Sequence, residues 1–385
     1  MKLTRPLRVA HVATVDLTLR YQLLGELRLV RDAGHDVTLL SARGPDTTEL
    51  EASGFRHLHV PFNRRLTPAR DLAALARLVA HFRRERFDLV HVHTPKASLV
   101  GALAARMAGV PHVVGTAHGL RVPVAGDPAT RAGWIAAERA IASLVDVLLV
   151  ESREDAAAAP RLGLRPRREV RWIGGGIDLV RFSPSARAAE LRAGVREELG
   201  VPPGALVVGF VGRLVEEKGV LDLVRAIGTV RQRIPGAHAL IVGAPDLEKA
   251  DAVRVTAGVR SGPREGCTFT GLRHDVERLH AAFDVFCLPS RREGLPRVAM
   301  EAAAMGVPSV LSDVRGCREI VDEGVEGLLV PPGDVPALAG ALERLLTDAA
   351  LAQRLGAAAR ERALRQFDER AAAARIVAVY AELAG

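Results

Sequence analysis

The stretch DVFCLPSRREGLPRVAMEAAAMGVPSVLS, residues 284–312, decides the expected fold, because it reads as a strand, a loop, a helix and a second strand. The apolar run at 284–290 is short and bounded by turn residues, which is typical of a buried strand. Pro296 suits the first turn of a helix, where its missing amide hydrogen has no use. Another short apolar run follows at 309–312. Two strands joined by a helix usually pair in parallel, so this stretch predicts a parallel sheet.

The same alternation of strands and helices extends over nearly the whole chain. Helical patterns in the first half lie at 21–33, 69–86, 97–108 and 129–143. Strand candidates lie at 7–14, 36–42, 55–62, 88–94, 112–118 and 145–151, and then at 205–212, 237–243, 267–271, 284–290, 309–312 and 327–332. This order is the signature of parallel sheets covered by helices on both faces. It predicts an α/β protein with two Rossmann-like, doubly wound sheets that face each other across a cleft.

Length and composition support two domains. A chain of 385 residues with 48% hydrophobic residues exceeds what one core usually holds. The sequence pattern changes at 174–204, where GGGIDLVRFSP and later GVPPG mark the expected linker. We expect an N-terminal domain over 1–182, a C-terminal domain over 183–366, and a last helix over 367–385 that crosses back to brace the first domain.

The net charge of +8 favours an anionic partner, such as a phosphorylated ligand or an anionic membrane surface. With 4% aromatic residues and no helix-turn-helix, finger or RNA-binding motif, the chain is not expected to bind nucleic acid. The longest apolar runs are shorter than the roughly 18 residues of a membrane helix, and the start MKLTRPLRVAHVAT has no apolar signal segment. We therefore expect a cytoplasmic protein, peripheral on the inner face of the cell membrane if its positive charge contacts lipid.

Two carboxylates flank the expected start of the helix in the opening stretch. Glu293 precedes Gly294 and Leu295, whose amides at a helix N-terminus would attract phosphate. Glu301 lies inside the helix, and a continuous helix would separate the two carboxylates by about 12 Å. Glycosidases hold their acid/base pair about 5 to 9.5 Å apart, so two ends of one ligand suit this pair better. A surface helix with two solvated glutamates would give the same pattern.

The loop GRLVEEKG, residues 212–219, follows the first strand of the second domain. Arg213 and Lys218 would lie at the carboxyl end of that strand, where two cations could neutralise a diphosphate leaving group. The loop lacks the GxxxxGK[ST] order of a Walker loop, and GGG at 174–176 does not complete GxGxxG. Loops with an arginine and a lysine also occur without any such role.

Metal chemistry has little support in the sequence. His91 and His93 are two residues apart on one expected strand, so both point to one face and could ligate zinc, but no third ligand is evident. No D-x-D motif is present, and we expect no metal and no cofactor. The spacing of Cys267, Cys287 and Cys317 fits neither a zinc ribbon nor a disulfide framework, and it predicts buried thiols.

Two basic features could either bind a ligand or be ordinary solvated charges on the surface. Lys96 follows a strand and begins a helix, where it could meet an acceptor's phosphate or remain solvated. The run HFRRERF at 81–87 is either a charged helix end or part of a basic face for anionic lipid. The other members of that face would be Arg64, Arg65, Arg70 and Arg77.

Several motifs together resemble one enzyme family. GRLVEEKG, FTG at 269–271, LPSRREGLPRVAMEAAAMGVPSVLSDVRGCREIV and GLLVPPGD resemble the retaining glycosyltransferase family 4, which has the two-domain GT-B fold. Glu293 and Glu301 match its E-x7-E pattern. HVHTPKASLVGALAARMAGVPHVVGTAHGL, residues 91–120, resembles the CapM-like subgroup, which transfers sugars to polyprenyl-linked or capsular acceptors. The match covers nearly the whole chain.

The resemblance implies roles for the residues that match the family's motifs. Arg213 and Lys218 would hold the donor's diphosphate, Gly294 and Leu295 would offer it backbone amides, and Glu293 would bind hydroxyls of the transferred sugar.

Four further residues complete the implied donor site. Glu301 would hold the ribose hydroxyls, and His118 would lie near the donor sugar. Leu272 and Arg273 would read the base through their backbone groups. Arg213, Lys218, Glu293 and His118 are thus the implied catalytic residues.

The acceptor side departs from a common family pattern. TVDLTLR, residues 14–20, stands where many members carry a paired-glycine loop. Thr14, Asp16 and Arg20 would still lie at the mouth of the cleft and, with Lys96, contact the acceptor.

The sequence therefore predicts a retaining, metal-independent transferase. It would move a hexose or N-acetylhexosamine from a nucleotide diphosphate sugar, in our expectation a UDP-sugar, to a polyprenyl-linked or other glycan acceptor in cell-surface polysaccharide synthesis. The family is thought to react by front-face displacement, which needs no enzymic nucleophile. The alternatives are a sugar-nucleotide 2-epimerase or donor hydrolase on the same fold, and a non-catalytic nucleotide-sugar-binding scaffold.

Overall fold

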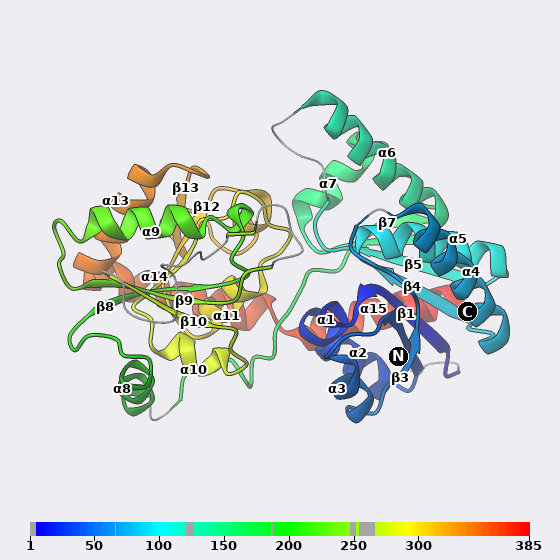
Figure 1. Cartoon of the computed structure of the whole chain (residues 1–385), viewed down its shortest axis with the longest axis horizontal. Helices are drawn as coiled ribbons and strands as arrows, with labels where there is room; N and C mark the ends of the chain where they lie inside the picture. The colour runs from blue at the N-terminus through cyan, green and yellow to red at the C-terminus, as the bar shows by residue number, and fades with distance from the viewer. Residues whose placement is uncertain (1–4, 66, 121–126, 186–187, 247–251, 254–265) are drawn as a thin grey trace. The chain divides into compact units, whose positions relative to one another are not determined.

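The chain folds into two compact units, each built on one sheet (Figure 1). The computed structural model describes residues 5–65, 67–120, 127–185, 188–246, 252–253 and 266–385. Unit 1 comprises residues 1–175 and 369–385, and unit 2 comprises residues 176–368. The division thus falls a few residues before the expected boundary at 182. The initial basic residues 1–4 lie outside the described part of the chain.

The sheet of unit 1 has seven parallel strands in the order β3-β2-β1-β4-β5-β6-β7. The strands are β1 Arg8–Val15, β2 Asp36–Ala42, β3 Arg56–His59, β4 Leu89–His93, β5 His112–Ala117, β6 Val147–Val150 and β7 Glu169–Trp172. Six of them fall within or beside the predicted ranges. Strand β7 is a seventh that the pattern did not predict, because its four residues EVRW alternate charged and apolar side chains and lie partly exposed at the sheet edge, unlike the apolar runs of the other strands.

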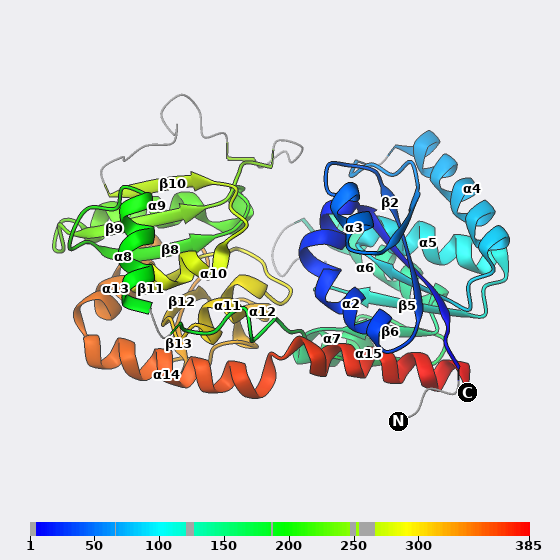
Figure 2. The ribbon, with the colours of Figure 1, turned by 90° about the horizontal axis from the view of Figure 1, so that it is seen from below.

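Helices cover both faces of this sheet (Figure 2). Helices α4 and α5 pack on one face, and α2 and α15 pack on the other. The helical segments of unit 1 are α1 Asp16–Thr18, the π-turn η1 Leu19–Leu23, α2 Leu24–Asp32, α3 Thr47–Ala52, α4 Pro68–Glu85, α5 Pro95–Ala108, α6 Pro128–Leu144, α7 Arg153–Arg161 and α15 Glu369–Ala384. The segment 14–20, expected as a loop, is therefore helical from Asp16 onward.

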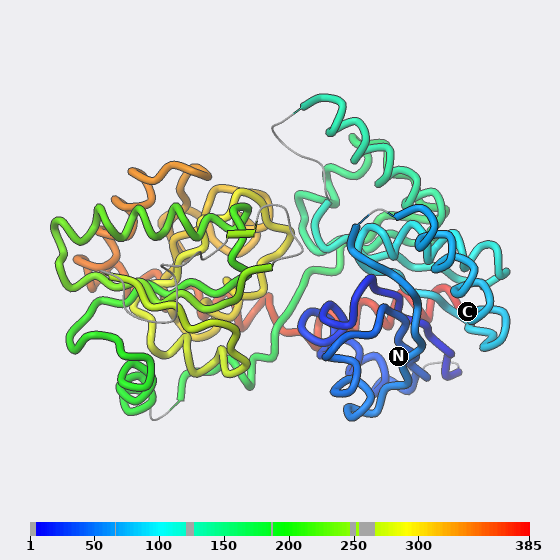
Figure 3. Tube along the Cα trace, in the orientation of Figure 1, coloured from blue at the N-terminus to red at the C-terminus, as the bar shows by residue number. Residues whose placement is uncertain are grey.

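The last helix belongs to the core of unit 1. Helix α15 packs against α2, as the red and blue segments of Figure 3 show. Ile376, Val379 and Tyr380 are almost completely buried in the same hydrophobic cluster as Leu23 and Leu27. Residues more than 340 positions apart in the sequence thus share one core, so the folding of unit 1 depends on the end of the chain.

The sheet of unit 2 has six parallel strands in the order β10-β9-β8-β11-β12-β13. The strands are β8 Leu206–Val211, β9 Ala237–Val242, β10 Cys267–Gly271, β11 Val285–Leu288, β12 Ser309–Ser312 and β13 Gly327–Val330. The helices are α8 Ala188–Glu198, the 3-10 turn η2 Glu216–Lys218, α9 Val220–Val230, α10 Val276–Ala281, α11 Arg297–Ala304, α12 Arg315–Arg318, α13 Val335–Thr347 and α14 Ala349–Gln366. All six strands were predicted, because buried parallel strands read as continuous apolar runs.

In each sheet the direction of strand addition reverses at one point. In unit 1 this point lies between β1 and β4, and in unit 2 it lies between β8 and β11. The loops that leave the carboxyl ends of two such neighbours diverge to opposite faces, and open α/β sheets bind ligands there. The fold therefore directs attention to the loops after β1, β4, β8 and β11.

The structure confirms the prediction for the cysteines. Cys267, Cys287 and Cys317 are free and buried, and burial raises the pKa of the Cys287 and Cys317 thiols. A separate finding concerns membranes: none of the helices in the described ranges is both long and apolar enough to cross a bilayer.

Candidate active site

The candidate donor site of unit 2 begins with two neighbouring strands. Strand β8 pairs with β11, with Val208 opposite Val285. After β8 the chain forms the turn η2, and after β11 it runs through residues 289–296 into α11. Because parallel strands end at the same edge of a sheet, these two loops emerge side by side.

The two loops meet in an ion pair between Lys218 and Glu293. Lys218 Nζ donates to Glu293 Oε1 and Oε2 at 2.6 and 2.7 Å. Ser290 Oγ donates to Glu293 Oε1 at 2.7 Å. The side chain of Glu293 is only 7% exposed and that of Lys218 19%, so water screens this pair weakly. The structure thus brings together two residues that the sequence placed in separate motifs.

Further contacts join the same loops into one platform. The amide of Arg291 donates to the carbonyl oxygen of Glu217 at 2.8 Å, and its guanidinium donates to Asp222 Oδ2 at 3.0 Å. Arg292 and Glu217 form an ion pair of 2.6 Å. Asp222 lies in the first turn of α9, so the platform is anchored to a buried helix.

Two glycines allow the backbones to approach this closely. Gly219 has φ +69°, and a Cβ built on it would lie 2.0 Å from the carbonyl oxygen of Pro289. A Cβ on Gly316 would lie 1.9 Å from the carbonyl oxygen of Gly294. Both distances are far below any normal contact, so a side chain at either position would force the loops apart.

The segment before α11 offers free hydrogen-bond donors. Among the residues that the structure describes, the amides of Gly294 and Leu295 have no acceptor. Pro296 caps the helix, one residue before the predicted helical position. Glu301 lies in the helix, mostly buried, with its Oε2 3.8 Å from Nε2 of the buried His280. The amides and Glu301 could therefore address separate parts of one ligand, as the sequence predicted.

Arg213 has an acidic partner that the sequence analysis missed. Its guanidinium donates to Asp246 Oδ2 at 2.8 Å, and its side chain is 45% exposed. Asp246 follows β9, the neighbour of β8, in the run VGAPD. A carboxylate shortly after a neighbouring strand is the signal that could have identified this pair.

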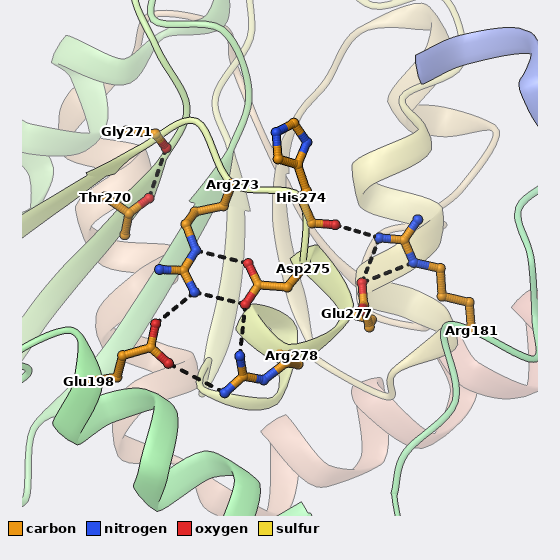
Figure 4. A network of polar contacts seen from close by, with 9 residues as sticks. All are labelled: Arg181, Glu198, Thr270, Gly271, Arg273, His274, Asp275, Glu277 and Arg278. Carbon is orange, nitrogen blue, oxygen red and sulfur yellow. Dashed lines mark hydrogen bonds and ion pairs between the residues drawn. The ribbon is translucent and has the colours of Figure 1, made fainter. Parts of the chain in front are cut away.

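Arg273 lies in a network of charges beside its expected site (Figure 4). It donates to both carboxylate oxygens of Asp275 at 2.8 Å and to Glu198 Oε1 at 2.8 Å. These bonds lower the pKa of Asp275 to about 2 and raise the pKa of Arg273. Leu272, by contrast, is 63% exposed. The arginine side chain thus connects α8 to the start of α10, which leaves base contacts to backbone groups.

In unit 1, His118 follows β5 and is held from both ring nitrogens. Its Nδ1 lies 2.8 Å from Glu151 Oε1, and its Nε2 lies 3.2 Å from His93 Nδ1. Glu151 follows β6, the neighbour of β5. Glu151 was given no role from the sequence, although it is the last residue of the predicted strand 145–151, just as His118 is the last residue of the predicted strand 112–118.

The first strand and β4 meet at their carboxyl ends. Thr14 Oγ1 and Thr94 Oγ1 are 2.8 Å apart. Thr94 has φ +66°, which is a costly conformation for a β-branched residue and is typical of functional turns. Thr14 therefore lies at the reversal point of this sheet, as a ligand-contacting residue should.

The remaining acceptor candidates are tied to the protein itself. Asp16 accepts from the amide of Leu17 at 2.9 Å and from Thr47 Oγ1 at 3.0 Å, and it is buried. Arg20 pairs with Glu49.

Lys96 has the most partners among these candidates. It donates to Asp71 Oδ1 at 2.7 Å and to Asn63 Oδ1 at 3.0 Å. These bonds hold the segment around Asn63 to the start of α5, so Lys96 is not an ordinary solvated lysine.

His91 and His93 have neighbours that the sequence did not reveal. Ligand atoms of His11, Glu26, His91 and His93 lie within 4.8 Å of one another, in a group that could hold a metal ion. The expectation that His91 and His93 have no third potential ligand is therefore wrong, because His11 and Glu26 lie beside them in the folded chain. His11 lies on β1, 80 residues away in sequence, and only strand pairing brings it beside His91.

Comparison with known proteins identifies the family of the chain. A profile described as Glycosyltransferase Family 4 matches residues 25–181, and one described as Glycosyl transferases group 1 matches residues 205–348. The UDP-Gal:alpha-D-GlcNAc-diphosphoundecaprenol alpha-1,3-galactosyltransferase of Escherichia coli is 27% identical over 90% of this chain and 89% of its own. The capsular polysaccharide biosynthesis glycosyltransferase CapM of Staphylococcus aureus is 24% identical over 94% and 93%.

A solved structure supports the fold. HepE of Anabaena, in complex with UDP and glucose, superposes with a TM-score of 0.82 at 24% identity over 98% of this chain and 100% of its own. The two doubly wound parallel sheets are those of the GT-B fold. The chain belongs to glycosyltransferase family 4, which confirms the resemblance in its motifs, and CapM is among its relatives.

The Lys218–Glu293 pair predicts that the rate of sugar transfer depends on the positive charge of Lys218. Lys218→Ala should lower kcat of sugar transfer by about 100-fold or more, because removing one donor to a developing anion typically costs that much. Lys218→Arg retains the charge and should lose less. Circular dichroism and steady-state kinetics would check both variants. Normal kinetics in a folded Lys218→Ala protein would remove Lys218 from the site.

The close approach at Gly219 predicts that Gly→Ala changes the free energy of unfolding in opposite directions at two glycines of unit 2. Gly219→Ala should destabilise unit 2 by about 2 kcal/mol, because the methyl group meets Pro289 and φ is positive. Gly228→Ala, on an exposed part of α9 with nothing within 4 Å, should stabilise by up to about 1 kcal/mol. Urea unfolding would measure the stability of both variants. Equal effects of the two substitutions would contradict the close backbone approach at Gly219.

The Asp275 network predicts a pH-dependent contribution to stability. The pKa of Asp275 is lowered in the folded state from 3.8 to about 2, so its contribution is present above about pH 4 and is lost as pH falls towards 2. Asp275→Asn should cost about 1 kcal/mol at pH 7, since partial exposure weakens the pair. The loss should be smaller at pH 3. Asp313→Asn, which affects an exposed pair, is the control, and a pH-independent loss would refute the explanation.

Proposed function

We propose that this glycosyltransferase transfers a hexose or N-acetylhexosamine from a UDP-sugar with retention of configuration and without a metal ion. The observation that carries the proposal is the ion pair of Lys218 and Glu293 beside the free amides of Gly294 and Leu295. A lysine ammonium has three N–H bonds, so Lys218 can hold Glu293 and a phosphate oxygen together. Cation and amides would then neutralise the departing diphosphate.

Glu293 and Glu301 would hold the two sugar-containing ends of the donor. Glu293 is fixed by Lys218 and Ser290, so its carboxylate is oriented before a sugar hydroxyl arrives. Glu301 would accept from the ribose hydroxyls, and the backbone of Leu272 and Arg273 would contact the base. Such preorganisation lowers the entropic cost of placing the anomeric carbon beside an acceptor hydroxyl. We assign no enzymic nucleophile, in keeping with front-face displacement.

For the acceptor we propose a lipid-linked or other glycan with a phosphate group. The E. coli relative acts on a diphosphoundecaprenol-linked GlcNAc, and the net charge of this chain is +8. Thr14, Asp16, Arg20 and Lys96 would contact the acceptor. The product would enter cell-surface polysaccharide.

The place of action follows from this acceptor. We propose a cytoplasmic enzyme that contacts an anionic membrane surface through the basic face described above. Arg64, Arg65, Arg70 and Arg77 are all exposed. Each well-placed cation would contribute about 1 kcal/mol to binding of anionic lipid.

A thermal-shift panel of UDP-, GDP- and ADP-sugars, each with EDTA present, tests the donor class. A ligand at 100 times its Kd stabilises the folded state by about 2.7 kcal/mol, so UDP-sugars should raise Tm clearly and the others should not. A shift that disappears with EDTA would contradict the metal-free site.

Matched variants sharpen this experiment. Glu301→Gln should reduce the UDP-sugar shift, whereas Glu277→Gln, in an ion pair with Arg181 outside the site, should not. Donor turnover without any acceptor would favour a hydrolase or 2-epimerase. A shift without turnover of any donor would favour a non-catalytic nucleotide-sugar-binding scaffold, and no shift with any donor would contradict the proposed donor site.

A further inference from the structure

Three buried histidines line the same face of the sheet in unit 1. His91 and His93 are two residues apart on β4, so their side chains share a face, and His11 of β1 is directly opposite His91. All three are completely buried. The same face is covered by α15, which places Tyr380 against them. So many polar rings in a sheet core require an internal hydrogen-bond arrangement.

Hydrogen-bond distances join these rings and two hydroxyl groups into one continuous hydrogen-bond chain. Thr116 Oγ1 lies 2.6 Å from His91 Nε2, and His91 Nδ1 lies 2.6 Å from the Tyr380 hydroxyl. The Tyr380 hydroxyl lies 3.4 Å from His11 Nε2.

The chain then continues to the candidate active site. His11 Nδ1 lies 3.0 Å from His93 Nε2, His93 Nδ1 lies 3.2 Å from His118 Nε2, and His118 Nδ1 lies 2.8 Å from Glu151 Oε1. Every ring nitrogen of the four histidines therefore has a partner. The chain starts at a buried hydroxyl and ends at a carboxylate.

With all four rings neutral, one direction of donation satisfies all of these bonds, because a neutral imidazole has one N–H and one lone pair. Burial lowers the pKa of His11 to about 3 and the pKa values of His91 and His93 well below their ordinary value, which favours the neutral form of these three rings. A carboxylate only accepts, so a neutral His118 donates from Nδ1 to Glu151 and accepts at Nε2 from His93.

The direction of each remaining hydrogen bond follows in turn, from His93 back to Thr116. His93 then accepts at Nε2 from His11 Nδ1, and His11 accepts at Nε2 from the Tyr380 hydroxyl. Tyr380 in turn accepts from His91 Nδ1, and His91 accepts from Thr116. The carboxylate at one end and the Tyr380 hydroxyl, acting through His11 and His93, thus favour the same tautomer of His118.

We propose that this hydrogen-bond chain positions His118. Tyr380 of the last helix, acting through His11 and His93, holds the imidazole of His118 as its Nδ1–H tautomer. The inference deepens the proposed function, because it rests on the role near the donor sugar that the family resemblance implies for His118. Tyr380 and the buried histidines touch no substrate, and His118 is the member at the open end. The last helix therefore supports the site as well as the core.

Two other titratable groups lie around the hydrogen-bond chain. Glu26 of α2 and His35 are near Tyr380 and His11, and the His35 ring lies edge-on to Tyr380 with centroids 5.7 Å apart. A metal ion held by His11, Glu26, His91 and His93 is the competing explanation. Each ring nitrogen of these histidines already has a hydrogen-bond partner, so a metal ion on any of them would break the hydrogen-bond chain, and the two explanations exclude each other.

The test is the nitrogen NMR spectrum of histidine-labelled full-length protein, with His118 assigned from a His118→Gln variant. Ring nitrogen shifts distinguish the tautomers, and we expect the Nδ1–H form of His118 at pH 7 in the wild type. Tyr380→Phe retains the ring but removes the hydroxyl, and it should give mixed tautomers at His118. Thr116→Val, at the far end of the chain, should have a weaker effect in the same direction.

Kinetics provide the second readout. Tyr380→Phe should lower kcat on the order of tenfold with little change in the donor KM, because a misoriented group at the reacting centre costs rate. Val379→Ala, on the same helix, opens a cavity without touching the chain. It should lower stability and leave both the tautomer and kcat unchanged.

Three outcomes would overturn the proposal. They are an Nε2–H tautomer of His118 in the wild type, an unchanged tautomer in Tyr380→Phe, and about one equivalent of zinc in the purified protein. The tautomer is measured without any donor or acceptor, so a failure of the proposed transferase activity remains distinguishable from a failure of this inference.

Discussion

The pairing of β8 with β11 is the constraint on which the candidate active site depends. These strands are separated by more than 70 residues, yet they are neighbours in the sheet. Only because they end side by side can Lys218 of one loop meet Glu293 of the other at 2.6 Å. The platform around them then follows from glycine positions that permit backbone contact. A shift of this register would separate Arg213 and Lys218 from Glu293 and Glu301.

The sheet of unit 1 repeats the principle with different chemistry. Strands β1 and β4 are neighbours at its reversal point, and their pairing places Thr14 beside Thr94 and His11 opposite His91. One consequence is a contact between hydroxyl groups at the sheet edge. The other is a buried line of histidines that runs towards His118. Both units thus place their chemistry where the order of strands reverses.

Charge compensation is common to the site residues. Arg213 pairs with Asp246, Lys96 with Asp71, Arg273 with Asp275, and Lys218 with Glu293. Cations held in this way are oriented before a ligand binds, and they lose less conformational freedom when it does. An anionic ligand must add to these pairs or displace one partner. Lys218 is suited to addition, since it is partly exposed and has a third N–H bond.

The sequence alone determined the fold class and the motifs, because buried parallel strands, helix starts and glycine-bounded loops depend on local residue order. Glu293, Glu301, Arg213 and Lys218 were identified in this way, and their roles in the donor site stay proposals. The edge strand β7 escaped prediction because its four residues alternate charged and apolar side chains and lack the continuous apolar run of the others. Only the tertiary structure decided the partners: Asp246 for Arg213, Glu151 for His118, and His11 with Tyr380 for His91. Such contacts join residues that are 30 to nearly 300 positions apart, and strand order and helix packing, which no local pattern records, bring them together.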